Sequence, residues 1–372
     1  MKYLLFLFPI ILILLSLFIY FDSKAPGRPN DVTLIEESST TVVETEKIKP
    51  QPTTTPIKKL LANDYQIFQT FNNCGPASLS MALSYYGIHV SQNILGDELR
   101  PYQVAGGDND DKSVTFEELA EKANDYSLIA YHRPSGDIGL IKQFINLGVP
   151  VIAKTWTKEN EDIGHFRVVK GYDDTTREII QDDSLQGKNL KYSYELFNKL
   201  WEKFNYEYLV LIPPDKKETA EKILGENADQ LIAWKKAVEL SREELRANPD
   251  NIYARFNLSV AFFRIGEYQQ SVNEFEKIEN KLPFRTLWYQ IEPIKAYFEL
   301  KNYQRVMDIS EKILNNHNRA FSELYMLRGE VHLAQNNPAK AKEEFELALR
   351  YNVNLKGVRE TLDRVSADLN QP

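Results

Sequence analysis

The sequence predicts an α+β domain followed by an all-α domain of repeats, with an apolar segment at the N-terminus. Residues 4–20 are uncharged and rich in leucine, isoleucine and phenylalanine. Between about residues 60 and 214, helical patterns come first and short, mostly antiparallel strands follow. From residue 228 onwards the patterns are helical and recur. The 372 residues are too many for one ordinary core, which favours two folded domains.

Residues 1–21 are expected to form a transmembrane anchor or a signal peptide. Lys2 gives the apolar run a positive front, and the run is just long enough to span a bilayer. We expect an uncleaved, single-pass anchor in the cell membrane, with the folded domains on the extracytoplasmic side. The alternative is secretion after cleavage at Ser23-Lys24-Ala25, where small residues stand three and one before the cut.

Residues 22–59 are expected to be a disordered linker rich in proline and threonine. The segment holds five prolines and the run Thr53-Thr54-Thr55, and it shows no apolar period. Over the whole chain the formal net charge is −8, and lysine and arginine are scattered among acids rather than gathered in a stripe. This pattern argues against a nucleic-acid partner.

Cys74 is the only cysteine of the chain, so it cannot form an internal disulfide. Gly75 and Pro76 follow it, and a proline is tolerated in the first turn of a helix. Apolar residues then recur at helical spacing, which predicts a helix over residues 74–86, ended by Gly87. A thiol at a helix N-terminus is stabilised as the thiolate, so Cys74 is a candidate nucleophile.

The other elements of this domain follow from caps, breakers and apolar alternation. The pattern Thr115-Phe116-Glu117-Glu118 is a capping box, and Gly148 is a helix stop. Predicted helices cover residues 92–99, 115–124, 138–147 and 194–204, and predicted strands cover residues 128–132, 149–156, 165–172, 178–182 and 206–212.

Three polar residues could assist a cysteine nucleophile. His165 begins a predicted strand and can serve as the base. A carboxylate on the next strand can orient its ring, and the pair Asp182-Asp183 ends that strand. Because side chains alternate along a strand, only one of the two can face the histidine. Gln69, five residues before Cys74, can donate to an oxyanion.

Residues 65–214 resemble papain-like cysteine peptidases of family 39, the bacteriocin-processing or double-glycine-leader type. The resemblance rests on Gln69 with the Asn72–Ala77 box, on the runs Gly164–Val169 and Gly171–Asp173, on Asp183–Gly187, and on the closing run Phe204–Val210. It implies a papain-like domain over residues 60–214 that hydrolyses peptide bonds. It also implies Cys74 as nucleophile, His165 as base, Asp183 rather than Asp182 as the acid, and Gln69 as oxyanion donor.

The chain also departs from the best-known members of that family, which are fused to a transporter with an ATPase. No G-x-x-x-x-G-K-[ST] motif occurs here, so export of the product is not expected. No cofactor is expected, because a cysteine–histidine pair works without metal. The acidic run Asp108–Asp111 lacks the spacing of a calcium loop and is interpreted as solvated.

The second folded unit is expected over residues 218–366. A spacing of 35 residues aligns Phe262 with Tyr297 and His332, and resembles tetratricopeptide repeats with one extra residue per unit. Three repeats begin near Ile252, Leu287 and Ser322, after a leading helix at Asp229–Ala247. Pro293 predicts a bent middle repeat. Such an array usually binds a peptide or protein partner.

Three functions are therefore open. The first is a membrane-tethered, exported cysteine peptidase whose repeats recruit a substrate or partner. The second is an inert papain-like scaffold whose repeats mediate protein binding. The third is an acyl or amide transferase that uses the same residues, because an amine can resolve a thioester as water does.

Overall fold

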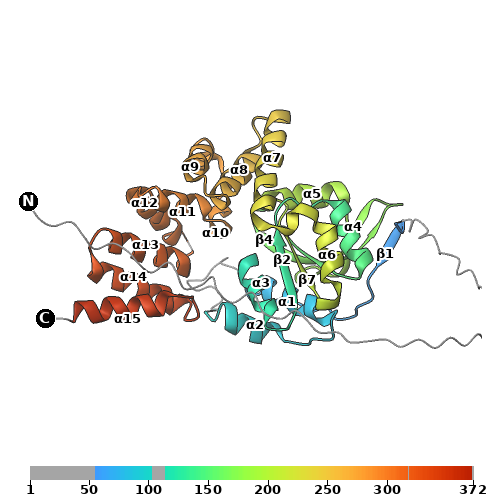
Figure 1. The fold of residues 1–372 in the computed structure, drawn as a ribbon, viewed down its shortest axis with the longest axis horizontal. Helices are drawn as coiled ribbons and strands as arrows, with labels where there is room; N and C mark the ends of the chain where they lie inside the picture. The colour runs from blue at the N-terminus through green and yellow to red at the C-terminus, as the bar shows by residue number, and fades with distance from the viewer. Residues whose placement is uncertain (1–54, 103–113, 317, 371–372) are drawn as a thin grey trace, which may run out of the picture. The chain divides into compact units, whose positions relative to one another are not determined.

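The computed structural model describes residues 55–102, 114–316 and 318–370 (Figure 1). The expected anchor, most of the expected linker and the acidic run Asp108–Asp111 lie outside these residues. Within the described part of the chain, no helix has both the length and the apolar character needed to cross a membrane.

One antiparallel sheet forms the centre of the α+β domain. Its strands are β1 (Lys58–Leu60), β2 (Ile129–Arg133), β3 (Val151–Trp156), β4 (Gly164–Asp173), β5 (Glu178–Asp183), β6 (Gly187–Ser193) and β7 (Tyr208–Ile212). The order is β2-β7-β3-β4-β5-β6, and β1 pairs with β4. The strands predicted from β2 to β5 and at β7 are confirmed, with ends that shift by one or two residues.

Two strands correct the sequence-based expectation. The strand β1 includes Lys58 and Lys59, which the sequence predicts as part of the disordered linker. The strand β6 was not predicted, because its side chains are mostly polar and lie at the exposed side of β5. Both strands are short of apolar residues, and they are held mainly by backbone pairing, by the Lys58–Asp173 ion pair of β1 and by Tyr192 of β6, which packs on the core.

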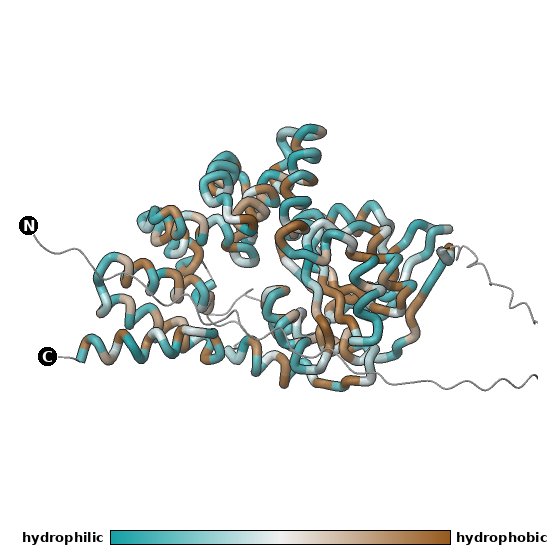
Figure 2. Tube along the Cα trace, viewed as in Figure 1, coloured by the Kyte–Doolittle hydropathy of each residue, from teal (hydrophilic) through white to brown (hydrophobic). Residues whose placement is uncertain are grey.

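Four of the helices in this domain pack on the sheet, and a fifth, the second in chain order, packs on the first. They are α1 (Cys74–Ser84), α2 (Gln92–Leu99), α3 (Phe116–Asn124), α4 (Ile138–Leu147) and α5 (Tyr194–Trp201). One face of the sheet shares a core with α1 and α3, and the opposite face shares a core with α4 and α5. Apolar residues accordingly line the sheet in Figure 2. The predicted helix over residues 194–204 ends early at Trp201, and a 3₁₀ turn follows it.

The helix α1 is held tightly against β4. The hydroxyl of Ser78 donates to the carbonyl oxygen of Phe166 at 3.1 Å. A Cβ atom on Gly75 would lie 2.1 Å from a methyl carbon of Val114, so only glycine fits there. The start of α1 is thereby fixed beside the start of β4.

The repeat domain follows α6 (Lys217–Leu224) and is entirely helical. It comprises α7 (Gln230–Ala247), α8 (Ile252–Arg264), α9 (Tyr268–Glu276), α10 (Thr286–Tyr289), α11 (Glu292–Glu299), α12 (Tyr303–Leu314), α13 (Ser322–Ala334), α14 (Pro338–Tyr351) and α15 (Val358–Leu369). The predicted starts at Ile252 and Ser322 are confirmed. The middle repeat is broken into α10 and α11 just before Pro293, as expected for a bent unit.

Several polar contacts join the repeat domain to the α+β domain. Asn257 accepts a hydrogen bond from the backbone N–H of Asn205 at 3.2 Å. Arg264 pairs with Glu117 at 2.7 Å. The guanidinium of Arg100 pairs with Glu118 and with Glu323 of α13. These contacts come from α8 and α13, so the first helices of two repeats face the α+β domain.

Candidate active site

Four sequence-predicted residues meet around the start of α1. Cys74 is the first residue of α1, His165 is the second residue of β4, and Asp183 ends the neighbouring strand β5. Gln69 lies in the segment that leads into α1. Three of them, Gln69, Cys74 and His165, line one pocket of about 310 Å³.

Cys74 and His165 are buried side chains that line the same pocket, and each shifts the pKa of the other. Burial raises the pKa of the Cys74 thiol, but the hydrogen bond and charge of His165 outweigh it, so the pKa falls below its ordinary value. Burial lowers the pKa of His165, yet hydrogen bonds to Asp183 and Cys74 raise it overall. Both shifts favour a thiolate beside an imidazolium.

The second ring nitrogen of His165 meets Asp183. Its Nε2 lies 3.0 Å from Oδ1 of Asp183, and both side chains are almost fully buried. The same oxygen accepts the backbone N–H groups of Leu185 and Gln186 at 2.7 and 2.8 Å. Burial raises the pKa of Asp183, but His165 and Arg167 lower it far more, so this carboxyl stays ionised. Since Nε2 is engaged here, Nδ1 is the ring nitrogen that remains for Cys74.

Asp182 points elsewhere. Its Oδ1 lies 2.7 Å from Nζ of Lys170, and both side chains are buried. The same oxygen accepts the backbone N–H of Asn189 at 2.9 Å. Asp183 is therefore the carboxylate that contacts the histidine, while Asp182 belongs to a separate buried ion pair.

Arg167 is a member of this site that sequence reasoning missed. It is fully buried directly across from Asp183, and its guanidinium pairs with the second carboxylate oxygen. Its other nitrogens donate to Thr155 at 2.9 Å and to the carbonyl oxygen of Thr157 at 2.7 Å. The side chain thus fixes Asp183 from the side opposite to His165. The signal in the sequence is the position of Arg167: it lies two residues after the candidate base, on the same face of the predicted strand.

Gln69 is held with its amide oxygen occupied. The hydroxyl of Ser184 donates to Oε1 of Gln69 at 2.8 Å, and the backbone N–H of Gln69 donates to the carbonyl oxygen of Ser184 at 2.9 Å. Among the described residues, Nε2 of Gln69 has no hydrogen-bond acceptor, so Oε1 is the occupied end of this amide.

A buried lysine near the pocket was also missed. Nζ of Lys154 lies 5.1, 5.1 and 5.2 Å from the ring centres of Phe166, Phe204 and Tyr289. Burial lowers the pKa of Lys154, and the positive charge of its amine in turn lowers the pKa of Cys74. Lys154 therefore acts on the thiol through its charge.

Apolar side chains surround the mouth of the pocket. Phe71 and Leu185 line it and are 39 and 49% exposed, and nearby Phe68 is 64% exposed. Exposed apolar groups of this size suit the binding of a peptide side chain. Within residues 55–102, 114–316 and 318–370, no group of three or more His, Cys, Asp or Glu side chains could hold a metal ion.

The chain is similar in sequence to known proteins over its first domain. Residues 53–209 match the sequence model of the Peptidase_C39 like family. The uncharacterized protein YvpB of Bacillus subtilis is 25% identical over 244 residues, which cover 54% of this chain and 96% of that protein.

Two further relatives concern the separate domains. A TPR repeat-containing protein of Methanocaldococcus jannaschii is 27% identical over 138 residues, which cover 35% of this chain and 23% of that protein. The solved peptidase domain of Streptococcus ComA, a bifunctional ABC transporter, is 21% identical with a TM-score of 0.31, and the match covers 42% of this chain and 98% of that domain. The first folded domain is thus similar to the Peptidase_C39 like family over residues 53–209, and the helices that follow are similar to tetratricopeptide repeats.

Proposed function

We propose that this chain is a cysteine peptidase that hydrolyses peptide bonds at Cys74. The observation that carries the proposal is that Cys74 and His165 line one pocket, while Nε2 of His165 lies 3.0 Å from Oδ1 of Asp183. The similarity of the first domain to the Peptidase_C39 like family supports it.

In the proposed reaction, the thiolate of Cys74 attacks the carbonyl carbon of the scissile peptide bond and forms a carbon–sulfur bond. Protonated His165 gives its proton to the leaving amine as the carbon–nitrogen bond breaks. His165 then takes a proton from water, which attacks the thioester and releases the acid and the Cys74 thiol. Asp183 keeps the imidazole oriented and stabilises its cation throughout.

The negative oxygen that forms during each attack needs donors. The free N–H groups of Gln69 and the backbone N–H of Cys74 at the helix N-terminus are proposed to supply them. The hydrogen bond from Ser184 to Gln69 supports this role, because it orients the amide so that nitrogen rather than oxygen is free.

Two alternatives share these residues. A transferase would resolve the same thioester with an amine, and an inert scaffold would not form the thioester at all. A mixed peptide library incubated with the full-length protein, with and without an added amine, separates the three by mass spectrometry. Peptidase action gives cleaved acids that require Cys74, and a transferase gives amine adducts. Equal turnover by wild type and Cys74→Ala would end both catalytic proposals.

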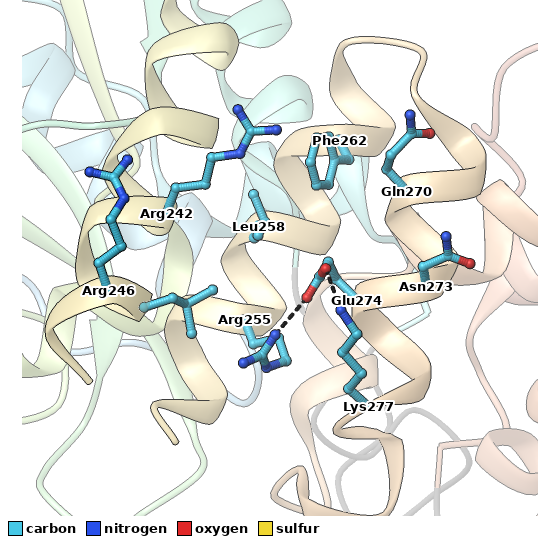
Figure 3. Close-up of a pocket in the computed structure, with 10 residues that line it drawn as sticks. Arg242, Arg246, Arg255, Leu258, Phe262, Gln270, Asn273, Glu274 and Lys277 are labelled. Atoms are coloured by element: carbon cyan, nitrogen blue, oxygen red, sulfur yellow. Dashed lines mark hydrogen bonds and ion pairs between the residues drawn. The ribbon is translucent and has the colours of Figure 1, made fainter. Parts of the chain in front are cut away.

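The repeat domain is proposed to bind a protein or peptide partner. A pocket of about 520 Å³ lies between α7, α8 and α9, and Figure 3 shows the side chains that line it. It is lined by the cations Arg242, Arg246, Arg255 and Lys277 and by a single acid, Glu274. Glu274 pairs with Arg255 and Lys277, at 2.7 and 2.6 Å, which leaves positive charge in excess. An acidic peptide segment is therefore the partner chemistry that suits this pocket.

A binding measurement tests that partner chemistry. A fluorescent glutamate-rich peptide should bind the wild-type protein with an affinity that falls as salt rises. The double variant Arg242→Glu, Arg246→Glu should weaken binding, whereas a control change at exposed Lys222 should not. Equal binding by all three proteins would contradict the assignment.

The location of the protein remains part of the proposal. We propose a single-pass anchor at residues 1–21 that holds the folded domains on the extracytoplasmic side, with secretion after cleavage as the alternative. The support is the uncharged run over residues 4–20. Membrane fractionation, followed by protease protection of intact cells, distinguishes the two.

A further inference from the structure

A short segment of the repeat domain reaches the pocket that holds Cys74. The helix α10 ends at Tyr289, and this tyrosine lines the pocket together with Cys74, His165 and Gly164. All other residues that line the pocket come from the α+β domain. The repeat domain therefore supplies one part of the wall.

The segment is anchored on the loop that leads into β4. Arg285 donates to Asp162 twice, from its backbone N–H to Oδ2 at 2.8 Å and from Nη1 to Oδ1 at 2.9 Å. Asp162 lies three residues before His165. A two-point contact fixes direction as well as distance, so α10 is tied to the strand end that carries the candidate base.

Tyr289 itself packs on the backbone beside His165. A Cβ atom built on Gly164 would lie 3.2 Å from two ring carbons of Tyr289 and 3.0 Å from the ring of Phe204. Gly164 thus permits a close approach of the tyrosine ring that most residues would hinder. The ring also lies 5.2 Å from Nζ of Lys154, which holds its other side.

Tyr289 contributes to the walls of two pockets. It lines the pocket of about 310 Å³ at Cys74 and also a second pocket of about 620 Å³ between the two domains. The second pocket is bordered by α3 of the α+β domain and by α11 of the repeat domain, through residues such as Glu117 and Glu292.

We propose that Tyr289 is a specificity-determining residue: it closes one side of the Cys74 pocket and limits the size of the group that can lie beside the thiol. This inference rests on the proposed function for its role in substrate choice. The repeat domain is then part of the substrate site as well as a partner-binding module.

Alkylation of Cys74 tests this inference without requiring turnover, because the chain has a single cysteine. The rates of reaction with iodoacetamide and with bulky pyrene maleimide are compared on the full-length protein. Tyr289→Ala should raise the ratio of the two alkylation rates, bulky to small reagent, by about tenfold or more. That is the scale on which a pocket wall discriminates between groups of different size. Tyr289→Phe should leave the ratio unchanged, because it keeps the ring.

Two further variants test whether a change in this ratio comes from the wall of the pocket or from a general change in the repeat domain. Phe298→Ala removes an aromatic side chain that packs on Tyr303 inside the repeat domain, away from the pocket, and should not change the ratio. Asp162→Ala releases the anchor of α10 and should raise the ratio in the same direction as Tyr289→Ala. An unchanged ratio in Tyr289→Ala, or an equal increase in Phe298→Ala, would overturn the inference.

The peptide library gives an independent readout on the same variants. Tyr289→Ala should gain cleavage next to bulky side chains relative to small ones. If no variant and no wild-type protein cleaves any peptide, the peptidase proposal fails, while the alkylation ratio still decides the role of Tyr289.

Discussion

Nε2 of His165 lies 3.0 Å from Oδ1 of Asp183, and both side chains are buried at the ends of neighbouring strands. This contact leaves the other ring nitrogen for Cys74 and keeps a negative charge behind the imidazole. A charge in that position stabilises the protonated ring, which the proposed ion pair requires.

Replacing the carboxylate tests this relationship. Asp183→Asn should lower kcat/KM for a cleaved peptide by roughly 10²- to 10⁴-fold, because the ring loses its counter-charge and the amide can hold it in the wrong tautomer. Asp182→Asn is the matched control: it removes the neighbouring charge but lies in the ion pair with Lys170. It should lower stability in urea unfolding and leave the specific activity of the folded protein close to wild type. Similar losses of activity in both variants would contradict the assignment of Asp183.

The dependence of kcat/KM on pH should also change in a defined direction in Asp183→Asn. Activity should rise as Cys74 loses its proton and fall as His165 loses its own, with the first limb shifted down and the second shifted up from their ordinary positions. Removal of the Asp183 charge takes away an interaction that raises the pKa of His165. The alkaline limb of kcat/KM should therefore move to lower pH in Asp183→Asn. An alkaline limb that stays in place would show that another group sets it.

Arg167 is expected to act on position and stability rather than on chemistry. Arg167→Met leaves the buried Asp183 carboxylate without one partner, which should destabilise the fold by about 3–5 kcal/mol. The measurement is the free energy of unfolding in urea, and activity is compared at low temperature where the variant remains folded. Arg167→Lys keeps the charge but cannot reach Thr155, Thr157 and Asp183 together, so it should recover part of the stability. Full stability in Arg167→Met would refute the account of this contact.

Gln69 should influence the transition state more than substrate binding. Gln69→Ala removes one proposed oxyanion donor and should lower kcat by about 10²- to 10³-fold with a small change in KM. Ser184→Ala releases the amide oxygen of Gln69 and should give a smaller loss in the same direction. A change confined to KM would instead indicate that Gln69 binds the ground state of the substrate.

The sequence was most informative where local chemistry determines structure. The capping box at Thr115 and the stop at Gly148 gave helix ends that are confirmed, and the Cys-Gly-Pro run gave the start of α1. The antiparallel order of β3, β4 and β5 brings His165 and Asp183 together, as the alternation of short strands indicated. Which of the two adjacent aspartates faces the ring depended on register and could not be derived from alternation alone.

Long-range contacts could not be predicted in this way. Lys58 pairs with Asp173, which is far from it in the sequence. No local pattern indicates that contact, so the sequence alone places β1 in the linker. Tyr289 and Gly164 lie in different domains, and nothing near either residue marks the other. The aromatic rings around Lys154 come from three separate segments for the same reason. Such contacts depend on tertiary packing, which periodicity does not report.

The most direct test of the account is the pH dependence of Cys74 alkylation in the wild type and in His165→Ala. The account predicts a thiol pKa below the ordinary value of about 8.5 in the wild type. It also predicts a higher thiol pKa once the imidazole is gone, because burial then acts without the opposing hydrogen bond and charge. A wild-type thiol that titrates at or above the ordinary value, or one that is unaffected by His165→Ala, would contradict the Cys74–His165 pair.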